Sequence, residues 1–233
     1  MTGVVLFGYG GMGKVIESII KERDDMEICR IIDFGEVIFE NGKEYDRLVG
    51  IDFSHFKMAD DNLAYVKENR IPLICGTTGL SEEQLNNLKE AGKVIPVCYS
   101  SNYSYGVLAM KKILAYAMNY LADWDIELVE AHHNKKADAP SGTAKTLLEI
   151  IGDGKKVYGR EGESLRTEGE IGVHAIRGGT ENGMHEVIFF GDNEQVSIKH
   201  HAQTRRIFAN GAVIAANRIP DEPGYYTFED IVG

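Results

Sequence analysis

The chain has 233 residues, of which 43% are hydrophobic and 26% charged, and its formal net charge is −11. This is ordinary globular composition, and no apolar run approaches the roughly 18 residues that a membrane span needs. The acidic balance argues against a general nucleic-acid binder, because neutralising phosphates requires a surplus of Lys and Arg. The length allows one large domain or two small ones.

The amino terminus, MTGVVLFGYGGMGK, lacks the basic start and small-residue cleavage site of a signal peptide. We therefore expect a cytoplasmic protein without a membrane partner. Cys29, Cys75 and Cys98 are widely spaced and flanked by apolar residues. They form neither a CxxC redox pair nor a zinc framework, so we expect buried thiols.

The first hundred residues alternate short apolar runs with amphipathic stretches. GVVLF (3–7) breaks into a glycine turn, after which isoleucines recur at helical spacing. Ser81 and Gln84 indicate a capping box at the start of a later helix. Strands that alternate with helices in this way are typical of a parallel, doubly wound sheet. The other expected elements are strands at 27–33, 49–53, 71–79 and 94–102 and a helix at 59–70.

The pattern changes after residue 102. A long helix of roughly 105–121 precedes a strand at 125–133, and another helix opens near Ser141. A glycine-rich polar segment then leads to three strand-like runs, which suit an open mixed or antiparallel sheet with helices on one face. The segment TRRIFANGAVIAANRI is expected to be a helix that packs back on the first domain. Its candidate core positions are Phe208, Val213 and Ile214.

A GxGxxG motif directly follows the first strand and opens a helix. Gly8 permits the tight turn, Gly10 lets a pyrophosphate approach the backbone, and Gly13 lets the helix pack on the strand. Asp33 follows 20 residues later at the end of the second strand, where a carboxylate can accept hydrogen bonds from an adenosine ribose. The motif predicts a dinucleotide site, although Asp33 in a purely structural role would only cap a turn.

The residue after Asp33 bears on the choice of cofactor. A 2′-phosphate favours an arginine there, and this chain has Phe34. NADH is therefore the favoured cofactor, with NADPH left open because Lys14 and Arg30 are alternative phosphate partners. Two further turns, 76–79 and 100–103, follow predicted strands and present hydroxyls and backbone N–H groups. Each turn alone is ordinary loop chemistry, and together they favour a nicotinamide pocket.

The stretch EAHHNKKADAPSGTAKTL, residues 130–147, combines several reactive groups. His132 and His133 end a strand, Lys136 follows in a loop, and the segment 141–143 lies at a helix N-terminus, which attracts carboxylates. Taken singly, each feature has a structural explanation as a strand end, a solvated loop or an N-cap. Zinc would need a third ligand. Their grouping favours a proton donor, a cation and an anion pocket that serve reduction of an anionic substrate.

These residues resemble a known family. EAHHNKKADAPSGTA is similar to the motif E-x-HH-x-x-K-x-D-x-PSGTA of 4-hydroxy-tetrahydrodipicolinate reductase, also called dihydrodipicolinate reductase, of lysine and diaminopimelate biosynthesis. The resemblance extends to GYGGMGK, GTTG, SSNYSYGV, IRGG and FANGAV, and so covers nearly the whole chain. It implies NAD(P)H-dependent reduction of a cyclic dicarboxylate, and a Rossmann domain joined to a tetramerising substrate domain, in a homotetramer.

The resemblance also implies roles for single residues. His132 would be the general acid and Lys136 a second proton donor that also binds substrate; the other substrate-binding positions would be His133, Ser141, Gly142 and Thr143. The expected cofactor-binding positions are Gly8, Tyr9, Gly10, Gly11, Met12, Gly13, Lys14, Asp33, Phe53, Gly76, Thr77, Thr78, Ser100, Ser101, Asn102, Tyr103 and Arg205. No metal is expected. A local positive field on the dianion is expected from Lys136, Arg177, Lys199 and Arg205.

We therefore expect a Rossmann-like dinucleotide-binding domain of residues 1–103 plus 207–233, and an α+β substrate-binding and oligomerisation domain of residues 104–206, built on an open mixed sheet. Two departures from the family stand out: a short segment between Asp33 and Val49, and Phe34 in place of the arginine that NADPH-using members often carry. Two alternatives stay open. One is another two-domain dehydrogenase, including an acylating type with Cys98 as nucleophile, and the other is a non-catalytic NADH-sensing regulator.

Overall fold

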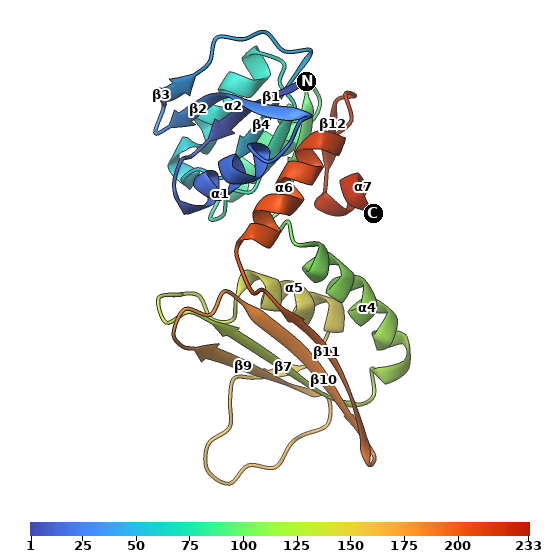
Figure 1. Ribbon diagram of the computed structural model, residues 1–233. Coiled ribbons are helices and arrows are strands. Elements are labelled where there is room, and N and C mark those ends of the chain that lie inside the picture. The colour runs from blue at the N-terminus through green and yellow to red at the C-terminus, as the bar shows by residue number, and fades with distance from the viewer. The chain divides into compact units, whose positions relative to one another are not determined.

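The computed structural model describes residues 1–233, which divide into two compact units. The first unit comprises Met1–Ser104 and Arg206–Gly233, and the second comprises Tyr105–Arg205 (Figure 1). None of the helices combines the length and the apolar character that crossing a membrane would require.

The first unit is built on a seven-stranded sheet of order β12-β6-β5-β4-β1-β2-β3. All neighbouring strands pair in parallel except β2 and β3, and the strand order reverses between β1 and β4. The predicted doubly wound parallel sheet is therefore confirmed. Its elements are β1 (Thr2–Phe7), α1 (Gly11–Ile20), β2 (Met26–Asp33), β3 (Glu36–Glu40), β4 (Arg47–Asp52), α2 (Ala59–Glu68), β5 (Leu73–Cys75), α3 (Glu82–Ala91), β6 (Pro96–Tyr99), α6 (Arg206–Arg218), β12 (Gly224–Tyr226) and α7 (Phe228–Val232).

Helices cover both faces of this sheet. Val5 and Phe7 of β1 pack in one core cluster with residues of α2 and α3, whereas α6 packs against α1. The predicted capping box is present, because the Ser81 hydroxyl accepts from the Gln84 backbone N–H and the Gln84 side chain accepts from the Ser81 backbone. Helix α6 is buried mainly through its alanines and Val213, whereas Phe208 and Ile214 are only half-buried, so two of its three expected core positions are wrong.

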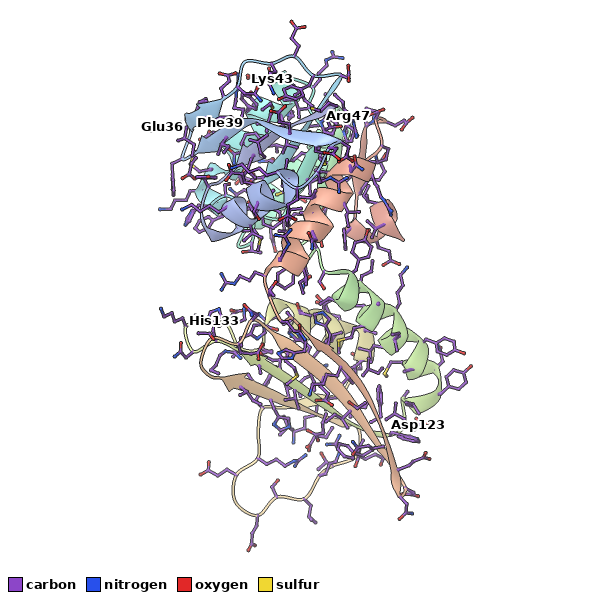
Figure 2. The ribbon with its side chains drawn as sticks, in the orientation of Figure 1. Glu36, Phe39, Lys43, Arg47, Asp123 and His133 are labelled. Atoms are coloured by element: carbon purple, nitrogen blue, oxygen red, sulfur yellow. The ribbon has the colours of Figure 1, made fainter.

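Strands β3 and β12 and helix α7 were not predicted. All five residues of β3 are exposed, so this antiparallel edge strand has no buried face to give an alternating pattern; Figure 2 labels Glu36 and Phe39 on it. Strand β12 has only three residues and α7 only five. Elements this short carry too few residues to show a period.

The second unit is an open five-stranded sheet of order β11-β10-β7-β9-β8 with two helices over one face (Figure 1). Strand β7 pairs antiparallel with β10 and parallel with β9, so the sheet is mixed as predicted. Leu128 of β7 and Phe189 of β10 are fully buried against α4 and α5. The elements are α4 (Tyr105–Leu121), β7 (Asp125–His132), α5 (Gly142–Ile151), β8 (Lys155–Val157), β9 (Glu170–Arg177), β10 (Met184–Gly191) and β11 (Glu194–His201), of which only β8 was not predicted.

Candidate functional site

The glycine turn of the first unit has two different kinds of glycine. A Cβ on Gly13 would lie 2.1 Å from the Gly8 carbonyl oxygen, and Gly8 itself has φ of +87°, so both positions need glycine for the fold. At Gly10 and Gly11 a Cβ would meet nothing within 4 Å. Gly10 is the N-cap of α1 and provides no side-chain cap. The start of α1 is therefore open, as binding of a pyrophosphate there requires.

Asp33 lies beside this turn. The backbone N–H of Tyr9 donates to Asp33 Oδ1 at 3.3 Å, which brings the carboxylate of β2 to the glycine loop. The Tyr9 hydroxyl donates to Glu17 at 2.7 Å, and the ammonium of Lys14 lies 5.6 Å from the Tyr9 ring centre. The predicted residues of this turn thus lie around one helix start.

Three loops of the first unit line a single cavity of about 290 Å³. The Phe53 ring lies against Gly76, where a Cβ would be only 2.3 Å from it. Asp52, 1% exposed, accepts from the Thr77 hydroxyl at 2.9 Å and from the Ser54 backbone N–H at 2.8 Å, so it fixes two of the loops. Eight expected cofactor positions line this cavity, namely Met12, Phe53, Gly76, Thr77, Thr78, Ser101, Asn102 and Tyr103; Ser54 and Phe208 are lining residues that sequence reasoning missed.

The remaining expected cofactor positions lie outside this cavity lining. The Ser100 hydroxyl donates to the Asn102 carbonyl at 2.8 Å and so stabilises its own turn. Tyr103, which does line the cavity, is almost fully buried, and its hydroxyl donates to the Cys75 carbonyl at 2.9 Å. Arg205 belongs to the second unit.

In the second unit the predicted catalytic histidine, His132, forms a close pair with a glutamate. His132 is the last residue of β7, and its Nδ1 lies 2.6 Å from Oε2 of Glu130, which is completely buried. His133 already lies in the loop after the strand (Figure 2). No group of three or more His, Cys, Asp or Glu side chains in residues 1–233 is placed to hold a metal ion.

Glu130 is the centre of the site and was not predicted. Arg177 donates to both of its oxygens, at 2.7 and 2.8 Å, and the backbone N–H of Ser141 donates to Oε1 at 3.2 Å. Burial alone would raise the pKa of Glu130, but the hydrogen bonds from Arg177 and His132 outweigh it and hold this pKa below its ordinary value. The carboxylate therefore joins the histidine, an arginine and the start of α5.

Burial lowers the pKa of His132 below its ordinary value. Glu130 opposes this shift, and the charges of Lys136 and Arg177 add to it. Glu130 alone favours the charged form of His132, through its hydrogen bond and its charge.

The anion pocket is predicted at the start of α5. Ser141 is the N-cap, and its hydroxyl accepts from the Ala144 backbone N–H at 3.1 Å. A Cβ on Gly142 would meet nothing within 4 Å, so the first turn is open to a ligand. The Ser141 hydroxyl also lies 2.8 Å from Nε2 of His185, a buried residue that sequence reasoning missed.

The four cations expected to give a positive field differ in their partners. Lys136 forms an ion pair with Asp138 at 2.7 Å, and Arg177 forms an ion pair with Glu130. Lys199 is paired with Glu186 at 3.2 Å. Three of the four expected cations therefore have a carboxylate partner.

Cys98 does not fit a nucleophile. All three cysteines are free and buried, as predicted. Burial raises the pKa of the Cys98 thiol to about 12, so the thiolate that acylating chemistry requires does not form. The acylating dehydrogenase alternative is therefore unsupported.

Two family models match this chain along nearly all of its length. "Dihydrodipicolinate reductase, N-terminus" matches residues 2–103, and "Dihydrodipicolinate reductase, C-terminus" matches residues 106–232. A curated 4-hydroxy-tetrahydrodipicolinate reductase from Staphylococcus aureus is 42% identical over 98% of this chain and 99% of its own length.

Solved structures share the fold. A dipicolinate-bound dihydrodipicolinate reductase from Paenisporosarcina sp. TG-14 matches with a TM-score of 0.76 at 22% identity, covering 100% of both chains. A diaminopimelate (DAP) dehydrogenase of C. glutamicum matches with a TM-score of 0.54 at 14% identity, covering 99% of this chain and 94% of that one. The chain belongs to the dihydrodipicolinate reductase family and is thus an oxidoreductase that binds a nicotinamide nucleotide.

Proposed function

We propose that this protein reduces 4-hydroxy-tetrahydrodipicolinate to tetrahydrodipicolinate in lysine and diaminopimelate biosynthesis. The observation that carries the proposal is the cluster in which Glu130 joins His132 to the open start of α5. One acid–base group and one carboxylate-binding helix start are thereby held at a fixed separation, which suits a substrate that carries carboxylates beside its reacting ring.

Different residues of the chain bind the substrate and transfer the proton. The open start of α5, at Gly142 and Thr143, binds a substrate carboxylate, and His133 and Lys136 assist. The bound nicotinamide supplies a hydride when it is present. The ring loses its hydroxyl as water before it accepts that hydride, because only the resulting C=C–C=N system has an acceptor carbon where the hydroxyl stood. After the hydride has added, the ring takes a proton from the imidazolium form of His132, with Lys136 as the second donor. A positioned acid typically contributes about 10²- to 10⁴-fold to such a step.

NADH is the proposed preferred cofactor. Asp33 is expected to accept from the adenosine ribose, and its hydrogen bond from Tyr9 of the glycine turn supports this. Phe34, 68% exposed, lies near the His55 ring at a centroid distance of 6.4 Å, and His55 stacks on Phe56 at 4.3 Å. These rings offer an apolar surface for adenine and no guanidinium for a 2′-phosphate.

Replacing Asp33 tests the cofactor preference. Asp33→Ala is expected to weaken binding of NADH more than binding of NADPH, because only the free 2′-hydroxyl donates to that carboxylate. Titration calorimetry with both cofactors measures this, and Glu36→Ala on the exposed edge strand is the matched control. A larger loss for NADPH would contradict the preference.

A coupled assay tests the reaction itself. The purified protein is supplied with the product of the upstream synthase, and oxidation of NADH and of NADPH is followed by absorbance. We expect turnover with both and a higher kcat/KM with NADH. Binding of pyridine-2,6-dicarboxylate, a flat analogue of the product ring, is expected to be competitive with substrate. Cofactor binding without turnover would instead support a regulator.

We further propose that the protein is a cytoplasmic homotetramer that associates through its second unit. The sheet face not covered by α4 and α5 carries exposed apolar side chains, including Ile176 and Phe190. Uncovered apolar residues on a sheet face favour contact with another copy. Sedimentation equilibrium is expected to give four times the chain mass, and a monomer would refute this part of the proposal.

A further inference from the structure

The buried carboxylate of Glu130 receives hydrogen bonds on both oxygens. Oε1 accepts from the Ser141 backbone N–H at 3.2 Å and from Arg177 at 2.7 Å, and Oε2 accepts from Arg177 at 2.8 Å. Nδ1 of His132 lies 2.6 Å from Oε2. An ionised carboxylate only accepts hydrogen bonds, and a guanidinium only donates them, so Nδ1 of His132 must carry the hydrogen.

We propose that Glu130 is a positioning residue that holds His132 in the tautomer with hydrogen on Nδ1, so that Nε2 is the only nitrogen that exchanges a proton with a ligand. The space beside Nε2 supports this. A Cβ on Gly183 would lie 3.1 Å from Nε2, and glycine at this position leaves that side of the ring uncovered. The catalytic meaning of the tautomer rests on the proposed function, whereas the tautomer itself does not.

Arg177 has a distinct part in this arrangement. Its two hydrogen bonds keep Glu130 ionised, so the carboxylate does not take the proton from Nδ1 but balances the charge when Nε2 gains one. The charged and titratable groups that act on His132 are Glu130 on its own strand, Lys136 in the following loop, Arg177 on β9 and His185 on β10. Of these, only Glu130 favours the imidazolium.

Nitrogen NMR of histidine-labelled protein tests the tautomer directly. The His132 signals are assigned by their loss in His132→Gln. At a pH above the pKa of His132, we expect the chemical shift of Nδ1 to lie in the range of a protonated nitrogen. The chemical shift of Nε2 is expected in the range of an unprotonated nitrogen. Hydrogen on Nε2 in the unmodified protein would overturn the proposal without any variant.

Glu130→Gln gives the second arm of the test. Oε1 faces two donors that cannot give up their hydrogen, Ser141 and Arg177, whereas Oε2 faces one such donor, Arg177, beside Nδ1 of His132. The amide oxygen is therefore expected at the Oε1 position, which turns the NH₂ group toward Nδ1. The NH₂ group donates to Nδ1 and moves the hydrogen to Nε2. We expect this exchange of nitrogen signals, with kcat lowered at least about tenfold and little change in NADH affinity. Unchanged His132 signals in a folded Glu130→Gln protein would also overturn the proposal.

Two further variants separate positioning from structure. Glu130→Asp keeps an acceptor-only side chain and is expected to retain the Nδ1–H tautomer. Glu127→Gln is the matched control, because Glu127 lies on the same strand and also contacts a histidine and an arginine. It is expected to leave the His132 signals unchanged. A correct tautomer in a protein without reductase activity would count against the proposed function and not against the positioning role.

Discussion

Strand β7 carries two clusters of the same three residue types, one on each face of the sheet. Glu130 contacts His132 and Arg177 on the face covered by helices, and Glu127 contacts His174 and Arg166 on the uncovered face. The His–Glu distances are nearly equal, 2.6 and 2.7 Å. Residue types and distances therefore do not distinguish the two clusters.

Burial and hydrogen-bond partners do distinguish them. The Glu130 side chain is 0% exposed and that of Glu127 is 19% exposed. Both carboxylate contacts of Arg177 go to Glu130, whereas Arg166 divides its carboxylate contacts between Glu127 and Asp125. Low dielectric strengthens each charge interaction in the covered cluster, and water screens those in the other.

The largest expected difference is in stability. Arg177→Ala leaves the buried Glu130 without its cation and is expected to cost about 3–5 kcal/mol. Arg166→Ala, at the partly exposed cluster, is expected to cost about 1 kcal/mol or less. Urea unfolding of both variants measures the two values. Equal losses of unfolding free energy in the two variants would show that burial of the carboxylate does not make the two clusters differ in stability.

The protein should also lose stability in acid because of His185, whose ring lies against that of His132 in the covered cluster. Burial lowers the pKa of His185 to about 4, so the unfolded chain binds a proton between pH 6.5 and 4 that the folded chain does not. The stability from this residue is full above about pH 6.5 and falls by about 3 kcal/mol as the pH drops to 4. His185→Gln is expected to flatten the unfolding free energy over this window. A slope identical to that of the unmodified protein would place the titration elsewhere.

Activity should respond only to the covered histidine. His132→Gln is expected to lower kcat by about 10²-fold with little loss of cofactor affinity, and Lys136→Ala to act likewise, because each removes a proton donor. His174→Gln is the matched control and is expected to stay within about twofold, provided that gel filtration shows the same assembly. Near-normal turnover of the His132 variant would mean that the acid is misassigned.

The smallest expected effect concerns two N-cap serines. Ser141→Ala and Ser81→Ala each remove a side-chain cap and are expected to cost about 1 kcal/mol of stability. Only Ser141→Ala should also raise KM for the substrate, because Ser141 holds the start of α5 beside Glu130. Steady-state kinetics beside thermal unfolding measures both. A raised KM in Ser81→Ala would show that the effect is not local.

Much of the fold follows from local patterns. The long elements, such as α4 and β10, have a buried face that repeats at helical or strand spacing, and the capping box of α3 is readable from two residues. Strand β3 was missed because nothing on it is buried, so it has no periodicity. Alanines, rather than the expected Phe208, fill the core side of α6, because α6 packs closely against α1.

The sequence by itself determined the glycine turn and the helix start at Ser141, because each is encoded by neighbours within a few positions. Only the tertiary structure decided which glutamate joins His132. Arg177 pairs with Glu130 and His174 with Glu127 at the same separation of 47 residues. Strand register and the helices over one face bury the first pair and leave the second partly exposed, and neither is a local property of the chain.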